Sequence, residues 1–182
     1  YSYILFNKYQ FGNTLEVCNC DCCISEEDSK VLFASPLTNI TPALIREYLN
    51  AASSENHFKL AQQIKFILPK ILDFITQGIE VSLAPEFTLA KLHIDLPNAW
   101  EEDEIIFMRK FSSLFFQDKL FNFVESDISD SYMVMFVNSG LDVKHLFNIW
   151  ENAIENYTPM LNFIQMLHYN FDSCFYYQSF AD

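Results

Sequence analysis

The sequence predicts an all-α protein folded as a single compact domain of seven or eight helices with short connections. Apolar residues recur at helical spacing over much of the chain, and only 3 of the 182 residues are glycine. The composition, with 51% hydrophobic and 19% charged residues, is typical of a globular chain. A chain of this length buries roughly 70% of the surface exposed on unfolding, so residues 1–182 are expected to share one core.

The N-terminal part predicts two short helices around a cysteine-rich loop. The apolar pattern from Tyr3 to Tyr9 fits one or two helical turns, which Gly12 ends. Residues 13–25 form the loop that carries the cysteines. Ser25 then precedes three acidic residues, a pattern typical of a helix N-cap, and predicts a helix to about Ala34.

The next two helices have clear start and stop signals. Thr41-Pro42 places an N-cap residue before a proline at the first helical position. From His57 to Gln77 the apolar residues keep the helical period, and Gly78 follows as a stop signal. Pro69 lies inside this stretch, where it must either kink the helix or begin a second one.

The centre of the chain is less regular. Alternating apolar residues predict at most one short extended segment near 79–83, followed by a short helix from about Glu86 to His93. Asn98 and Glu101 have the spacing of a capping box, which predicts a helix that reaches as far as Phe123.

Three further helices are expected toward the C-terminus. The apolar run from Tyr132 to Val137 fits a buried strand or a buried helix, and we favour a helix. Helices are also predicted over Asp142–Asn156 and from Thr158 to about Phe171, the second of them opened by another Thr-Pro pair.

Charge narrows the range of partners. The net charge is −13, and residues 98–182 contain 4 Lys or Arg against 13 Asp or Glu. Nucleic acids and anionic membrane surfaces bind through Lys and Arg, so neither is expected as a partner. The electrostatic field of an acidic protein surface attracts a basic protein partner. The alternative is that the charge only keeps an apolar chain in solution.

Targeting signals point to the cytoplasm. No apolar run reaches the length of a bilayer span, and the first residues have neither the basic leader nor the cleavage site of a signal peptide. The cysteines also lack the spacing of a secreted disulfide scaffold.

Four cysteines crowd into six residues. Cys20 and Cys23 have the C-x2-C spacing that binds zinc, and further soft-metal ligands would come from Cys18, Cys22 and the remote Cys174. Thiol–disulfide redox chemistry is an alternative for the same thiols, which lie just before a helix start. A third interpretation treats them as small buried apolar residues that hold the loop against the helices.

The first half of the chain resembles an uncharacterised bacterial protein family. The resemblance rests on a Cys-x-Cys-Cys element, a Leu/Pro-Leu pattern and an F-x-x-F-L-P-x-I-L-like helix ending at glycine. Here these are Cys20-Asp21-Cys22-Cys23, Leu32 with Pro36-Leu37 and Ile40, and Phe66–Leu72 up to Gly78. Because that family has no established activity, the resemblance implies a helical fold and a cysteine element but no catalytic role.

No sequence motif favours an enzyme. Three glycines cannot supply a phosphate-binding loop, a dinucleotide fingerprint or a nucleophile elbow, and the four histidines show no metal-binding spacing. The region from His145 onward is rich in aromatic residues, most of which we expect in the core. We therefore expect a non-enzymatic binding protein that recognises a basic protein partner or forms a homodimer, through a surface formed by Phe175, Tyr176, Tyr177 and Phe180.

Overall fold

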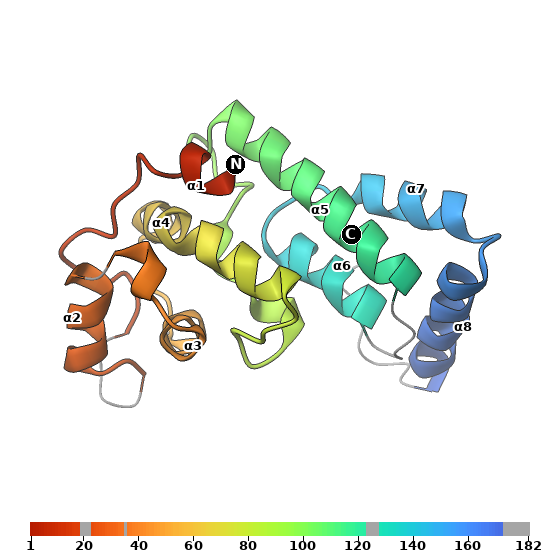
Figure 1. Cartoon of the computed structure of the whole chain (residues 1–182), viewed down its shortest axis with the longest axis horizontal. Coiled ribbons are helices and arrows are strands. Elements are labelled where there is room, and N and C mark those ends of the chain that lie inside the picture. Colours follow the sequence, from red (N-terminus) through yellow and green to blue (C-terminus); the bar gives the residue numbers. More distant parts are fainter. Residues whose placement is uncertain (19–22, 35, 123–127, 173–182) are drawn as a thin grey trace.

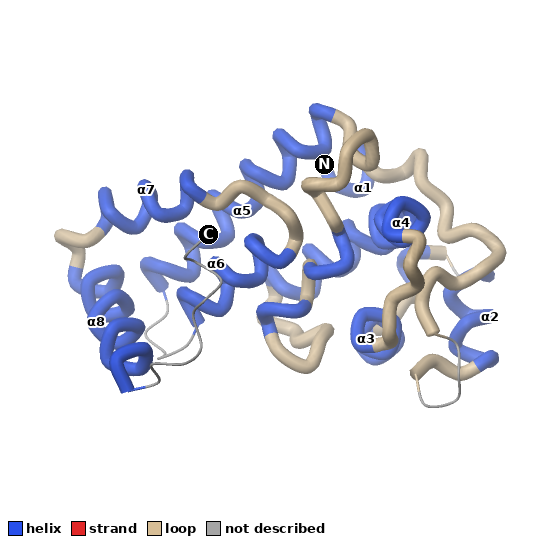
Figure 2. Tube along the Cα trace, turned by 180° about the vertical axis from the view of Figure 1, so that it is seen from behind, coloured by secondary structure: helices blue, strands red, loops and turns tan. Residues whose placement is uncertain are grey.

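The computed structural model describes residues 1–18, 23–34, 36–122 and 128–172. The described residues form eight α-helices and three short 3-10 helices (Figure 1). They contain no β-strand, only an isolated bridge between Val17 and Ser53, so the predicted all-α class is confirmed (Figure 2). In chain order the helices are α1 (Ser2–Leu5), α2 (Glu26–Ala34), η1 (Leu37–Asn39), α3 (Pro42–Asn50), α4 (His57–Thr76), η2 (Pro85–Phe87), η3 (Ala90–Leu92), α5 (Glu102–Asn122), α6 (Ile128–Asn138), α7 (Lys144–Ala153) and α8 (Tyr157–Asp172).

Two predicted helix starts are confirmed by their hydrogen bonds. The Ser25 hydroxyl accepts from the Asp28 N–H at 3.0 Å in front of α2. The Thr41 hydroxyl accepts from the Leu44 N–H at 3.2 Å in front of α3. Each side chain satisfies a backbone donor that has no partner within its helix.

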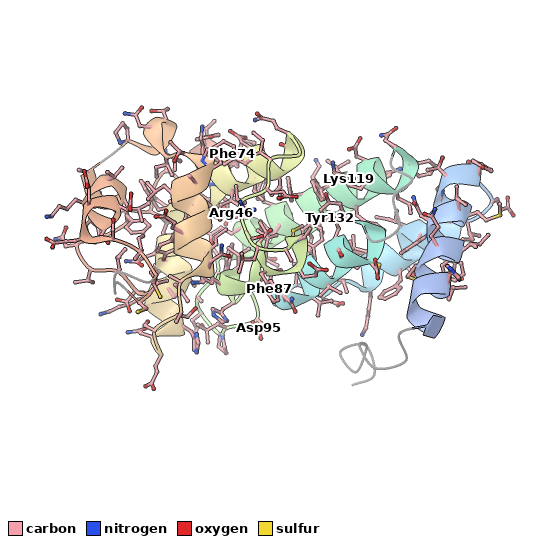
Figure 3. All side chains as sticks on the ribbon, turned by 90° about the horizontal axis from the view of Figure 1, so that it is seen from below. Arg46, Phe74, Phe87, Asp95, Lys119 and Tyr132 are labelled. Atoms are coloured by element: carbon pink, nitrogen blue, oxygen red, sulfur yellow. The ribbon has the colours of Figure 1, made fainter. Side chains whose placement is uncertain are left out.

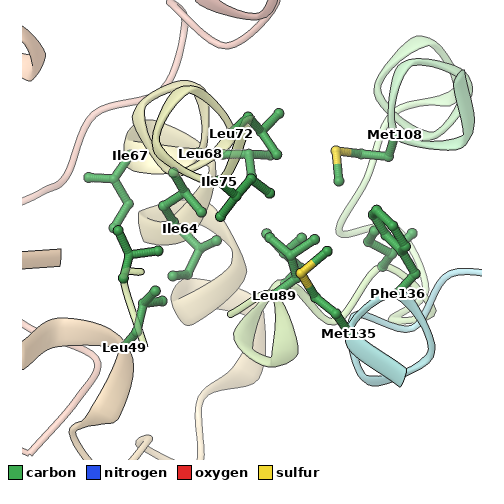
Figure 4. Close-up of a cluster of buried hydrophobic side chains, with 14 of the residues drawn as sticks. Leu49, Ile64, Ile67, Leu68, Leu72, Ile75, Leu89, Met108, Met135 and Phe136 are labelled. Carbon is green, nitrogen blue, oxygen red and sulfur yellow. The ribbon is translucent and has the colours of Figure 1, made fainter. Parts of the chain in front are cut away.

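Helix α4 supplies much of the core. Ile64, Ile67, Leu68 and Ile71 are at most 1% exposed. Figure 4 shows the α4 side chains on one side of the core, with Leu89, Met135 and Phe136 from later segments on the other. Helix α4 runs through Pro69 without ending, which excludes a second helix starting at that proline.

The segment between α4 and α5 differs from the prediction. Residues 79–83 form no strand, and the single helix expected from Glu86 to His93 is replaced by the two short turns η2 and η3. These turns are fixed by their neighbours, because η2 packs against α6 while η3 packs against both α4 and α6. Tertiary contacts have overridden a weak local helical preference.

The prediction that Asn98 and Glu101 form the capping box of α5 is wrong, because other residues form it. Asn98 has a left-handed backbone with φ of +62°, so it lies outside the helix. The cap forms three residues later, where the carboxylate of Glu104 accepts a hydrogen bond from the Glu101 N–H at 3.0 Å. A carboxylate at the third helical position commonly satisfies this donor.

The remaining helices form the other half of the molecule, in which α5 packs against α6, α7 and α8. The run from Tyr132 to Val137 is helical, as we favoured, and belongs to α6. Helix α8 lies across the end of the molecule that is opposite α2 and α3 (Figure 1). Within the described ranges, no helix combines the length and apolar character that a bilayer span requires.

Candidate functional site

The cysteine segment is described only in part. Cys18 and Cys23 are half-buried, and the Cys18 N–H donates to the Ala52 carbonyl at 2.7 Å. Cys20, Cys22 and Cys174 lie outside the described residues. No group of three or more metal-ligating side chains occurs among the residues that the structure describes, so the zinc site and the redox chemistry both stay predictions.

The predicted partner surface, Phe175, Tyr176, Tyr177 and Phe180, also lies outside the described residues. The aromatic residues just before it differ from expectation. We expected most of them in the core, yet among those from His145 onward whose burial the structure describes, Trp150 is buried, whereas Phe147, Tyr157 and Phe163 are 48%, 72% and 36% exposed. The C-terminal helices therefore expose more large apolar side chains than the sequence led us to expect.

The most notable surface feature is an apolar stripe along α8. Its members lie at spacings of three and four residues, so they share one face of the helix. All are substantially exposed: Met160 at 41%, Phe163 at 36%, Ile164 at 51% and Leu167 at 37%. We call these four residues the α8 face. A surface helix normally turns its apolar stripe toward the core, so an outward stripe indicates a binding surface.

The opposite side of α8 holds the helix in place. The Asn162 side chain donates to the Leu120 carbonyl of α5 at 3.0 Å, and the Trp150 indole N–H of α7 donates to the Pro159 carbonyl at 3.0 Å. At the edge of the α8 face, the Phe163 ring meets the Trp150 ring of α7 edge-on, with centroids 5.9 Å apart, so Phe163 is partly covered by α7. Because these contacts position α8, the α8 face is presented on a fixed scaffold.

A buried charge network joins α4, α5 and the N-terminal segment. The Lys65 ammonium donates to Glu104 at 2.7 Å, to the Ala99 carbonyl at 2.5 Å and to the Tyr9 hydroxyl at 3.1 Å. Burial opposes ionisation of Glu104, but hydrogen bonds from Lys65 and Tyr9 outweigh it and lower the pKa of that carboxyl. Burial lowers the pKa of Lys65. Every strong donor is already engaged inside the protein, so this network serves stability.

Two histidines that are distant in sequence meet at the start of α4. The His57 Nδ1 and His93 Nε2 atoms lie 3.1 Å apart, and His93 has a left-handed backbone with φ of +47°. Burial and the neighbouring His57 lower the pKa of His93. His57 lines a surface pocket together with Glu55, Asn56, Phe58, Leu96 and Pro97. Sequence spacing could not reveal a pair whose members are separated by 36 residues.

Comparisons of the chain with protein-family models, with curated proteins and with solved structures find no match.

Proposed function

We propose that this protein is a non-enzymatic interaction protein whose α8 face binds a basic, amphipathic helical segment of another protein. The observation that carries the proposal is the outward apolar stripe on α8. An amphipathic helix that lays its apolar side on such a surface is a common mode of peptide recognition.

The size of the α8 face suits this kind of contact. Full burial of one large apolar side chain contributes about 1.5–3 kcal/mol, and the α8 face offers four partly exposed ones. Even after the cost of association, this surface can supply the apolar centre of a small interface.

The charge around α8 favours a basic partner over a second copy of this chain. Beyond Lys144 the sequence has no Lys or Arg, whereas it has four acids, of which Glu151 and Glu155 are exposed on the elements that lead into α8. A lysine-bearing segment would be attracted, while two copies of a chain with net charge −13 would repel one another.

A pair of synthetic helical peptides tests this charge preference. Both have a leucine face, and the polar face is lysine in one and glutamate in the other. We expect the lysine peptide to bind and to quench or shift the fluorescence of Trp150, which contacts the α8 face through Phe163. Equal binding of the two peptides would contradict a basic partner, and a concentration-dependent dimer in light scattering would favour a second copy instead.

Thiol chemistry is the second candidate function. Cys23 packs against the core and lies close enough to the buried Lys91 ammonium to interact with it electrostatically. A nearby cation stabilises a thiolate, which is the form that binds metal and reacts. Elemental analysis of untagged protein and of a Cys20→Ser, Cys23→Ser variant tests this candidate. Stoichiometric zinc that the variant loses would support it, and metal-free protein with five titratable thiols would contradict a metal site.

A further inference from the structure

A second surface differs from the acidic surroundings of the α8 face, because it carries a cluster of positively charged side chains. Residues 98–182 contain four Lys or Arg, and three of them, Arg109, Lys110 and Lys144, line one pocket between α5 and α7. The fourth, Lys119, is buried, with its ammonium 5.3 Å from the centre of the Phe115 ring; Figure 3 labels it together with Tyr132. Every exposed cation of the acidic half therefore lies in this one pocket.

The three cations are available to a ligand. Arg109, Lys110 and Lys144 are exposed, and none forms an ion pair with a carboxylate in the described part of the chain. Elsewhere, exposed cations such as Lys8, Lys30 and Arg46 do pair with carboxylates. In a chain with 24 acidic residues, three exposed cations without such a partner form an uncompensated positive patch.

The pocket also contains neutral polar side chains and a helix N-terminus. Its volume is about 420 Å³, within the range of small-molecule sites, and Ser113, His145 and Asn148 contribute polar side chains to its lining. Lys144 and His145 are the first two residues of α7, so the positive end of that helix dipole lies at the pocket.

One carboxylate lowers the net positive charge of the pocket and so sets the charge of the anion that it can bind. Asp142 is part of the lining, and its Oδ1 accepts a hydrogen bond from the backbone N–H of Lys144 at 3.1 Å. Three cations and one carboxylate leave a net charge of +2 when His145 is neutral. Burial and the nearby Arg109 lower the pKa of His145 and favour its neutral form, while the Asp142 carbonyl and carboxylate oppose them. A doubly charged anion balances this pocket.

We propose that the α5–α7 pocket binds a phosphate dianion, either free or as the monoester group of a small molecule. Arg109 can bind two phosphate oxygens with its planar guanidinium, and Lys110 and Lys144 neutralise the remaining charge. The Asn148 amide supplies a neutral donor, whereas the Ser113 hydroxyl already donates to the Arg109 carbonyl at 2.9 Å. This site is independent of the α8 face and needs no protein partner.

The test is a titration with inorganic phosphate, and then with phenyl phosphate, at an ionic strength held constant with sodium chloride. Amide chemical shifts should change within residues 109–113 and 142–148 and saturate. Arg109→Gln and Lys144→Gln should each weaken binding by about tenfold, the loss expected for a charged hydrogen bond. The control Lys30→Gln changes an exposed lysine that is paired with Glu26. The affinity of this variant for phosphate should equal that of the wild type.

The two probes distinguish the two sources of the phosphate. Tighter binding of phenyl phosphate would assign the pocket to an ester, and equal binding would assign it to phosphate itself. Shifts that spread over all exposed lysines, or affinities that Arg109→Gln and Lys144→Gln leave unchanged, would overturn the proposal.

Discussion

The Lys65 ammonium lies 2.7 Å from the Glu104 carboxylate, and both side chains are at most 1% exposed. The pair connects α4 with α5, the two longest helices. Two buried charges carry a large desolvation cost, which is offset only when both are fully hydrogen-bonded. Here Tyr9, the Ala99 carbonyl and the Glu101 N–H complete the shell around the pair.

Removing one partner of this pair should be strongly destabilising. Lys65→Met leaves the buried Glu104 with only the more exposed Lys8, 3.1 Å away, as a cation, so we expect the free energy of unfolding to fall by about 3 kcal/mol, the lower end for a broken buried pair. The double variant Lys65→Met, Glu104→Leu should lose less than the sum of the two single changes. Urea denaturation measures all three. Lys30→Met is the matched control, because it breaks an exposed ion pair with Glu26 and should leave the free energy of unfolding close to that of the wild type. A Lys65→Met variant as stable as this control would contradict the buried role.

Stability should rise on the alkaline side of neutrality because of Lys91. Its ammonium donates to the carbonyls of Tyr48 and Ala51, and burial lowers its pKa to about 8 from the usual 10.5. Between these two values the unfolded chain binds more protons than the folded one, so the free energy of unfolding increases with pH. The buried Lys65, with its lowered pKa, adds to the same slope.

Urea denaturation at about pH 7.5 and about pH 9.5 checks this slope. The wild-type protein should gain stability between the two conditions, and Lys91→Met should gain less, keeping the share that Lys65 supplies. Tyr3, Tyr9 and Tyr48 oppose this slope near the upper pH, because burial raises their pKa values in the folded protein, that of Tyr3 to about 12, and unfolded tyrosines begin to ionise first. Lys91→Met keeps these tyrosines, so the difference between the two slopes reports Lys91. Identical slopes for the wild type and Lys91→Met would refute the assignment.

Two glycines with the same backbone conformation should respond differently to alanine. Gly140 and Gly78 have φ of +82° and +73°, where a side chain costs about 1–2 kcal/mol. A Cβ at Gly78 meets open space, but at Gly140 it would lie 2.7 Å from the backbone nitrogen of Asp95. Gly140→Ala should therefore destabilise the protein by about 1–3 kcal/mol more than Gly78→Ala, as measured by thermal unfolding. Equal losses would show that the contact between the end of α6 and Asp95 can relax.

Local sequence signals predicted the helices but not the contacts between them. Ser25 and Thr41 are capping residues within three positions of the donors they satisfy, so they could be identified from spacing alone. Lys65 and Glu104 are 39 residues apart, and the acidic run that contains Glu104 looked like an ordinary helix start. The turns η2 and η3 depend on packing against α4 and α6, which no local pattern contains.

The same distinction applies to the surfaces. The deficit of basic residues after Lys119 was evident in the sequence, but the convergence of Arg109, Lys110 and Lys144 requires α5 and α7 to lie side by side. The α8 face was missed because helical periodicity gives the position of an apolar stripe without its direction. Asn162 and Pro159 anchor the other side of α8, and that leaves the stripe outward.

The most direct test of the proposed function compares the affinity of the lysine-faced peptide for three forms of the protein. These are the wild type, an Ile164→Gln, Leu167→Gln variant, and the control Leu83→Gln, which changes a 78% exposed leucine outside the α8 face. Because the substituted side chains are exposed, all three forms should have the same stability to within about 0.5 kcal/mol. We predict that the α8 variant binds the peptide at least about tenfold more weakly, while the control binds as the wild type does. Unchanged affinity in the α8 variant would contradict the assignment of α8 as the partner-binding surface.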